Sequence, residues 1–215
     1  MNVLIKAGIA LPYQIIETTN KHSYFKFKEG YLEIHLSKSM KLNDLLKKLE
    51  ANIVSYYQKI KPVPANKFLL WGEKYNLVLK EGLFNYQIKE NNIFITSAIN
   101  EDYRALVYQD ALKNYLKAIE TDVKQTLFKY DINPVPIKLK KLKSKYGSYH
   151  RGKNYLVLNV LLASLEKEFS YYVLMHEYAH QKVANHQKEF YQLLKKLYPN
   201  YLKLDQALKK TVIHF

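Results

Sequence analysis

The residues best equipped for chemistry in this chain of 215 residues lie together in its last fifth. His176, Glu177 and His180 form an HExxH pattern, in which the two histidines are four positions apart. On a helix, this spacing places both imidazoles on one face, where they can bind one zinc ion at about 2.0–2.1 Å. Glu177 then points beside the metal, where it can hold a zinc-bound water molecule and accept its proton. The pattern therefore predicts a metal site with a neighbouring catalytic base.

A third histidine, His186, follows His180 by six residues. Three protein ligands and one open position are typical of a catalytic zinc site. A single histidine is more often an ordinary surface or core residue, but an HExxH pattern arises by chance only about 0.01 times in a chain of this length and composition. We therefore predict Zn²⁺ as the cofactor, His176, His180 and His186 as its ligands, and Glu177 as the catalytic residue.

Two helices are predicted to position these side chains. The first spans residues 166–182 and contains the whole HExxH pattern. Ala184 and Asn185 interrupt it, and Asn185 is a suitable N-cap for a second helix that ends before Pro199. His186 would then lie in the first turn of the second helix, from which it can fold back onto the metal.

Two short strands are predicted before these helices. Lysines and apolar residues alternate over residues 137–143, with a slip at Lys140 and Lys141 that a β-bulge would absorb. Residues 155–158 form a second apolar strand, after a turn at 151–154. No acidic residue occurs between Asp131 and Glu166, so this region forms a basic strip.

The first 99 residues are predicted to be mainly strands. Alternating patterns indicate one hairpin around Gly30, a second around Gly82, and a further strand at residues 92–96. Between the hairpins, residues 42–60 have helical spacing, and Pro62 and Pro64 follow them. The sequence shows no internal repeat.

A long connecting helix is predicted next, over residues 100–133. Asn100 is a fair N-cap, an apolar stripe runs from Leu112 to Leu127, and Pro134 and Pro136 follow. The expected fold class is therefore α+β. It comprises a β-rich N-terminal region (1–99), the connecting helix (100–133) and a C-terminal catalytic region (134–215) with a small sheet and the HExxH helix.

Composition limits the partners and the compartment. Thirty-four basic and nineteen acidic residues give a net charge of +15, which favours polyanions such as nucleic acid. Arg104 and Arg151 are the only arginines, however, and a dedicated phosphate-binding protein uses more. The absence of cysteine excludes disulfides and cysteine-based metal sites. No apolar run approaches the ~20 residues of a membrane helix and no signal-peptide pattern opens the chain, so we expect a cytoplasmic protein.

Five segments in the last third of the chain occur in a familiar order. They read KSKYGSY at 143–149, LN followed by LL at 158–162, YVLMHEYAH at 172–180, NHQKEFY at 185–191, and YP at 198–199. With these segments the sequence resembles the YgjP-like metallopeptidases, a zincin family related to the SprT-like and minigluzincin proteases. Tyr146, Tyr149 and Tyr178 depart from the family's usual tryptophan, cysteine and leucine. None of these departures affects a predicted ligand.

The resemblance implies a zinc metalloendopeptidase of zincin-like fold. It carries the ligand role to His176, His180 and His186, and the base role to Glu177. By analogy with zincins, a peptide substrate lies extended along an edge strand, for which residues 138–146 are the expected segment; its lysines would favour acidic peptides.

Two alternatives remain open from the sequence. The first is a nucleic-acid-associated SprT-like protease or a basic nucleic-acid-binding protein, against which the lack of cysteine and the scarcity of arginine both argue. The second is a zinc-binding scaffold without activity, against which the presence of Glu177 argues. The physiological substrate and the oligomeric state are not determined by the sequence.

Overall fold

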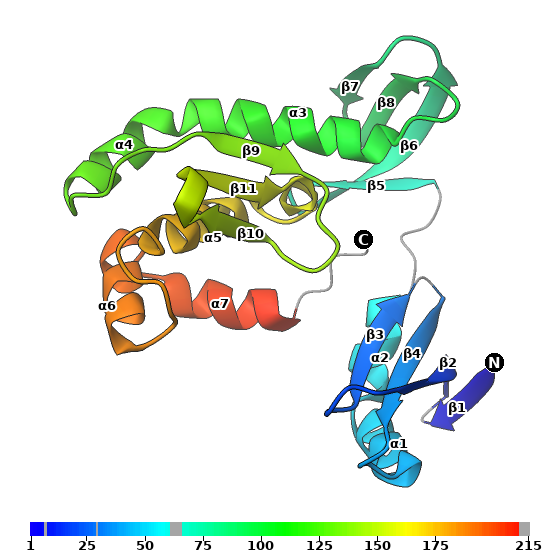
Figure 1. Ribbon diagram of the computed structural model, residues 1–215. Coiled ribbons are helices and arrows are strands. Elements are labelled where there is room, and N and C mark those ends of the chain that lie inside the picture. The colour runs from blue at the N-terminus through cyan, green and yellow to red at the C-terminus, as the bar shows by residue number, and fades with distance from the viewer. Residues whose placement is uncertain (7, 29, 61–65, 211–215) are drawn as a thin grey trace. The chain divides into compact units, whose positions relative to one another are not determined.

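The computed structural model describes residues 1–6, 8–28, 30–60 and 66–210 (Figure 1). It is a mixed α+β structure, as predicted. The chain forms two compact units, Met1–Pro64 and Ala65–Ile213. Contacts thus divide the chain at residue 64, whereas the sequence pattern changes at residues 99 and 133.

The first unit is a four-stranded sheet with two helices. Its elements are β1 (Asn2–Lys6), β2 (Ile9–Thr18), β3 (Tyr24–Lys28), β4 (Tyr31–Ser37), α1 (Leu42–Ala51) and α2 (Ile53–Ile60). The strand order is β1-β2-β4-β3, and β3 and β4 form the predicted antiparallel hairpin. Leu32 and Ile34 on one sheet face pack with Leu45 and Leu49 of α1. The single helix predicted over residues 42–60 is divided at Asn52, and the two prolines predicted to end it lie outside the described residues.

The second unit opens with a sheet of the same topology. Its strands are β5 (Lys67–Leu70), β6 (Glu73–Glu81), β7 (Asn85–Lys89) and β8 (Asn92–Ser97), in the order β5-β6-β8-β7. In both sheets the two central strands are parallel and the outer pairs antiparallel. The register matches as well, since Phe27 pairs with Leu32 and Ile88 pairs with Ile93.

One sequence-based prediction about this region is wrong, and one feature was not visible in the sequence. The feature is a structural repeat, because the two sheets share strand order and register. The hairpin predicted around Gly82 does not form, since β6 pairs in parallel with β8 while β7 forms the antiparallel hairpin with β8. Alternation of apolar residues identifies a strand and its buried face but does not specify its partner.

The predicted connecting helix is two helices, α3 (Tyr103–Ala118) and α4 (Glu120–Phe128), which meet at Ile119. The N-cap of α3 is Asp102 and not Asn100, because the Asp102 side chain accepts a hydrogen bond from the Ala105 amide. Val107 and Leu112 of α3 are buried in the core of the second unit.

A three-stranded sheet follows. Its strands are β9 (Ile137–Lys140), β10 (Gly147–His150) and β11 (Tyr155–Asn159), in the order β10-β11-β9. Short 3₁₀ helices, η1 (Arg151–Lys153) and η2 (Val160–Ser164), flank β11. The strand predicted over residues 137–143 ends at Lys140, and the predicted bulge gives way to a loop of residues 141–146 that leads into β10.

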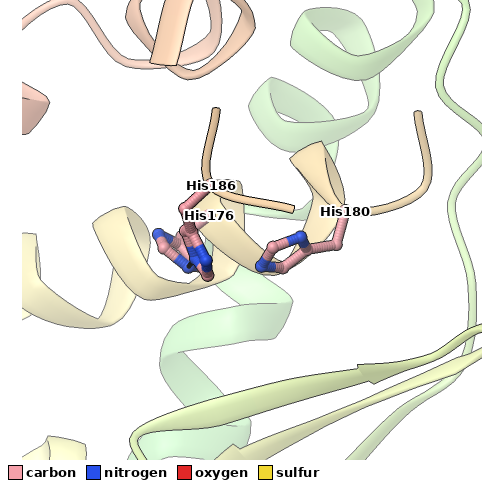
Figure 2. Close-up of side chains that lie close together, drawn as sticks. All are labelled: His176, His180 and His186. Carbon is pink, nitrogen blue, oxygen red and sulfur yellow. Dashed lines mark hydrogen bonds between the residues drawn. The ribbon is translucent and has the colours of Figure 1, made fainter. Parts of the chain in front are cut away.

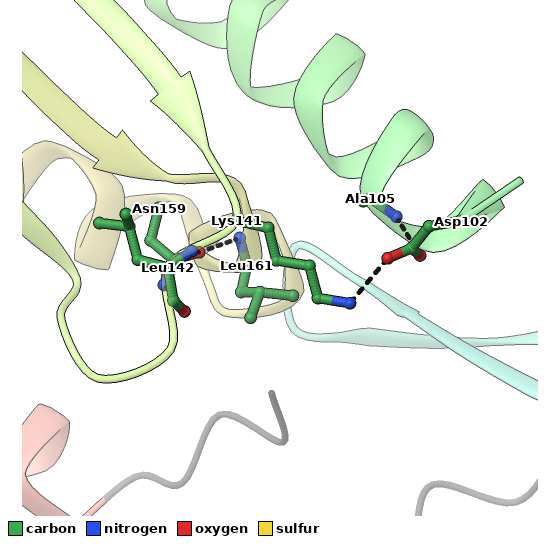
Figure 3. A network of polar contacts seen from close by, with 6 residues as sticks. All are labelled: Asp102, Ala105, Lys141, Leu142, Asn159 and Leu161. Atoms are coloured by element: carbon green, nitrogen blue, oxygen red, sulfur yellow. Dashed lines mark hydrogen bonds and ion pairs between the residues drawn. The ribbon is translucent and has the colours of Figure 1, made fainter.

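The buried side chain of Asn159 explains why β9 ends at Lys140. Its amide oxygen accepts hydrogen bonds from the backbone amides of Leu142 and Leu161, and its amide nitrogen donates to the carbonyls of Leu142 and Lys145. Figure 3 shows Asn159 with Leu142 and Leu161, beside the ion pair between Lys141 and Asp102. The loop backbone therefore bonds to Asn159 instead of to a neighbouring strand.

Three helices complete the unit: α5 (Lys167–Ala179), α6 (Lys188–Leu197) and α7 (Tyr201–Lys210). Helix α5 packs on β10 and β11, and α3 contacts β9. Leu116 and Val123 line one pocket with Ile137 and Leu139 of β9 and with Leu174 and Tyr178 of α5, so α3 and α4 lie on the same side of this sheet as α5. The second predicted helix starts later than expected, with Gln187 and not Asn185 as its N-cap, so His186 precedes it. Helix α7 was not predicted. Within the described residues, every helix is too short or too polar to span a membrane.

Candidate metal centre

The three predicted histidines converge from α5 and the loop after it. Figure 2 shows the rings of His176, His180 and His186 facing a common point. One nitrogen from each ring lies within 4.8 Å of the other two, and the Nε2 atoms of His176 and His186 are 3.0 Å apart. His176 and His180 lie on one face of α5 because they are one helical turn apart. The turn that follows α5 brings His186 back over this face.

Neighbouring groups orient the rings. The Nδ1 atom of His180 lies 3.0 Å from the carbonyl oxygen of Val183, so this nitrogen carries the proton and Nε2 is left with its lone pair. Phe190 of α6 packs within 4.9 Å of all three rings, measured between ring centroids. The Nδ1 atom of His176 is buried and has no hydrogen-bond partner within the described part of the chain.

Two of the histidines are held in the neutral form that a metal ligand needs. Burial, together with a smaller effect of the neighbouring His180 and His186, lowers the pKa of His176 to about 3. Burial also lowers the pKa of His180. Three converging imidazole nitrogens suit a divalent ion of zinc's preferences, so the residues present fit such a metal.

Glu177 lies beside this cluster and not within it. Its side chain faces β10 and only 7% of the residue is exposed. Burial raises the pKa of Glu177 to about 7, while a hydrogen bond from the Tyr149 backbone amide and the charge of Lys145 act in the opposite direction. The carboxylate is therefore available as a base near neutral pH.

These residues line a cavity of about 540 Å³. Its sides are formed by β10 with the loop before it, by α5, by the loop that carries His186, and by α7. Helix α7 is attached to the rest of the site by two tyrosines: Tyr172 donates to Asp205 at 3.0 Å and Tyr146 donates to the Leu208 carbonyl at 3.3 Å. Sequence reasoning missed this wall, although the Y–P segment that precedes α7 was part of the family resemblance.

The strand beside the cavity is β10, which the alternation pattern did not identify, although the KSKYGSY segment of the family resemblance overlaps it. Strand β9, within the segment expected to bind substrate, forms the opposite edge of the sheet. Only Lys145 and Tyr146 of that segment line the cavity. The expected substrate edge therefore shifts from residues 138–146 to residues 147–150.

Both arginines of the chain are engaged with backbone carbonyl groups. Arg104 donates to the Lys67 carbonyl at 3.0 Å and its guanidinium lies over the ring of Phe68. Arg151 donates to the carbonyl of His180 at 2.9 Å and so fixes the end of α5 that carries this histidine. Neither arginine is part of a phosphate-binding cluster in the described residues.

The sequence of the chain matches one protein family. The model of the YgjP-like metallopeptidase domain matches residues 31–211. The chain belongs to this family. It is accordingly a metalloprotease, and its convergent histidines occupy the matched region. No curated protein matches the chain.

Two solved structures are similar to this YgjP-like chain. The metallopeptidase zymogen abylysin of Pyrococcus abyssi is 23% identical, with a TM-score of 0.37, and the match covers 46% of this chain and 93% of abylysin. The zymogen jannalysin of Methanocaldococcus jannaschii is also 23% identical, with a TM-score of 0.37, covering 43% and 94% of the two chains.

Proposed function

We propose that this metallopeptidase is a zinc-dependent endopeptidase in which His176, His180 and His186 hold the metal and Glu177 is the general base. The observation that carries the proposal is the cluster of three imidazole nitrogens within 4.8 Å of one another, with a buried carboxylate on the same helix. His176 lies on α5 and His180 caps it, so the same helix also determines where Glu177 lies relative to these two proposed ligands.

The chain's own residues supply the proton transfer. Zinc, when bound, acts as a Lewis acid that polarises the peptide carbonyl and lowers the pKa of a water molecule. Glu177 accepts the proton of the attacking water and passes it to the leaving amine. Its largely buried position keeps the carboxylate strongly basic for this transfer.

The free edge of β10 offers a place for an extended peptide. The Asn159 amide donates to the Tyr146 carbonyl, so residues 146, 148 and 150 are the ones that bond to β11. The backbone groups of Gly147 and Tyr149 point the other way, toward the cavity. A substrate that adds to this edge would pair with Gly147 and with the Tyr149 carbonyl.

Metal analysis combined with peptide hydrolysis tests the proposal. We expect the purified protein to contain one zinc per chain, to cleave a quenched fluorescent peptide library, and to lose cleavage with a chelator and regain it with Zn²⁺. Glu177→Gln should keep the zinc and lower kcat about 10²–10⁴-fold. Full activity of Glu177→Gln, or cleavage that persists in metal-free protein, would contradict the assignment.

A further inference from the structure

We infer that Gly147 and the backbone amide of Tyr149 form a seat on the edge of β10 that positions the carboxylate of Glu177. In this role the two residues are positioning residues, since the absent side chain of Gly147 and the amide of Tyr149 act through the base. The inference rests on the proposed function only in giving Glu177 the role of base. The contacts between β10 and the Glu177 side chain do not depend on that role.

The first part of the seat is the missing side chain at Gly147. A β carbon at this position would lie 2.9 Å from both Cγ and Oε1 of Glu177 and 3.0 Å from Cγ1 of Val173. Non-bonded carbon atoms normally approach to about 3.5–4.0 Å. Any side chain at residue 147 would therefore push Glu177 away from β10, although the backbone of Gly147 does not have the positive φ that favours glycine elsewhere in this chain.

The second part is the amide of Tyr149. This N–H points away from β11, because residues 146, 148 and 150 are the ones that form the hydrogen bonds between β10 and β11. It donates a hydrogen bond to the Glu177 carboxylate. A buried carboxylate needs such a donor, since an unpaired charge in this position is costly. The bond and the close approach at Gly147 together restrict where the carboxylate can lie.

The seat is held in register by the loop before β10. Asn159 bonds to Leu142 and Lys145, and its own backbone amide donates to Tyr146. The start of β10 is thereby fixed to β11, which packs on α5 as well. Glu177 on α5 and its seat on β10 are consequently held by one rigid framework.

A double-mutant cycle on stability tests the seat without any substrate. We expect Gly147→Ala to lower the Tm of the metal-free chain by about 4–8 °C, as overpacking does in a domain of this size. In a Glu177→Ala background, at least half of that loss should disappear, because the side chain that collides is gone. Gly152→Ala is the matched control, since a β carbon there meets nothing within 4 Å. Equal losses in both backgrounds would overturn the inference.

The Tyr149 amide is tested by a pair of variants. Tyr149→Pro removes the N–H without breaking a ladder bond, because this amide faces the free edge. Tyr149→Ala removes the same ring but keeps the N–H. We expect zinc content to be unchanged in both and kcat on a library peptide to be at least tenfold lower in Tyr149→Pro than in Tyr149→Ala. Equal kcat values would overturn the role of the amide.

The two inferences fail separately. If the wild-type chain cleaves no peptide and the stability cycle still shows coupling, the proposed function fails and the seat stands. If cleavage occurs and neither Gly147→Ala nor Tyr149→Pro shows its expected effect, the seat fails and the proposed function stands.

Discussion

His176, His180 and His186 are held in place by different means. His176 is half-buried in α5, the ring of His180 bonds to the Val183 carbonyl, and His186 is exposed on a loop with Phe190 against its ring. Loss of the His186 ring is therefore expected to remove a proposed ligand while leaving the core intact.

We expect His186→Ala to keep the wild-type Tm in the metal-free state but to lose the rise in Tm that zinc produces in the wild type. Zinc stabilises only a folded site that binds it, by an amount set by its concentration relative to Kd. Thermal melts with and without Zn²⁺ measure this difference. His22→Ala, in the first unit, is the control and should respond to zinc as the wild type does.

Glu177 makes the metal-free protein's stability depend on pH. Because burial raises the pKa of Glu177 from 4.5 to about 7, the folded state binds its proton more tightly than the unfolded state does. The protonated carboxyl therefore favours folding fully below pH 4.5, and this advantage, about 3 kcal/mol, is lost as pH rises to about 7.

We expect the free energy of unfolding of the wild type, measured relative to Glu177→Gln, to fall between pH 5 and pH 8. His176 has the opposite effect, since its lowered pKa destabilises the fold as pH falls below 6.5. Both chains contain His176, so its effect cancels when the free energy of unfolding of Glu177→Gln is subtracted from that of the wild type. Urea denaturation of both metal-free chains at the two pH values provides the measurement. A difference that stays constant or grows with pH would show that Glu177 is not buried as described.

At the scale of elements, β10 is placed by a single buried side chain. Asn159 is fully buried and bonds to Leu142, Lys145 and Leu161. Figure 3 shows how the loop that it holds connects the N-terminus of α3, through Lys141 and Asp102, to the beginning of β10. The edge of the active-site cavity thus depends on a residue outside the cavity.

Asn159→Ala is expected to destabilise the chain by about 2–4 kcal/mol, because four hydrogen bonds are lost and buried backbone groups are left without partners. It should also reduce kcat, since β10 loses its anchor. Chemical denaturation and peptide hydrolysis measure the two effects. Asn114→Ala, at an exposed position of α3, is the control and should cost less than about 0.5 kcal/mol.

At the scale of the whole molecule, the chain contains two separate hydrophobic cores. One lies within residues 1–60 and the other within residues 66–210, and no residue belongs to both. All residues of the candidate site belong to the second unit. The first unit, with its repeated sheet topology, contributes no side chain to the cavity among the described residues.

A chain that starts at Ala65 is therefore expected to fold and to bind one zinc. Its core is self-contained, and a unit of this size buries enough surface to be stable alone. Circular dichroism melts and metal analysis of the truncated chain provide the check. Loss of cooperative unfolding or of zinc on truncation would show that the first unit is needed for the second.

The local pattern of the sequence determined where the candidate site lies. The spacing of His176, Glu177 and His180 needs only one helical segment to bring them together at the end of α5, and their residue types suit the proposed metal and base. Strand positions such as β3, β4 and β8 could be predicted for the same reason, because alternation over a few residues is a local property.

Only the tertiary structure decided which strands pair and what surrounds Glu177. The parallel pairing of β6 with β8, the position of β10 beside the cavity and the wall formed by α7 all join residues distant in sequence. Gly147 illustrates the reason, because its contact with Glu177 exists only once β10 and α5 pack together. Contacts of this kind depend on packing between elements, which no local periodicity encodes.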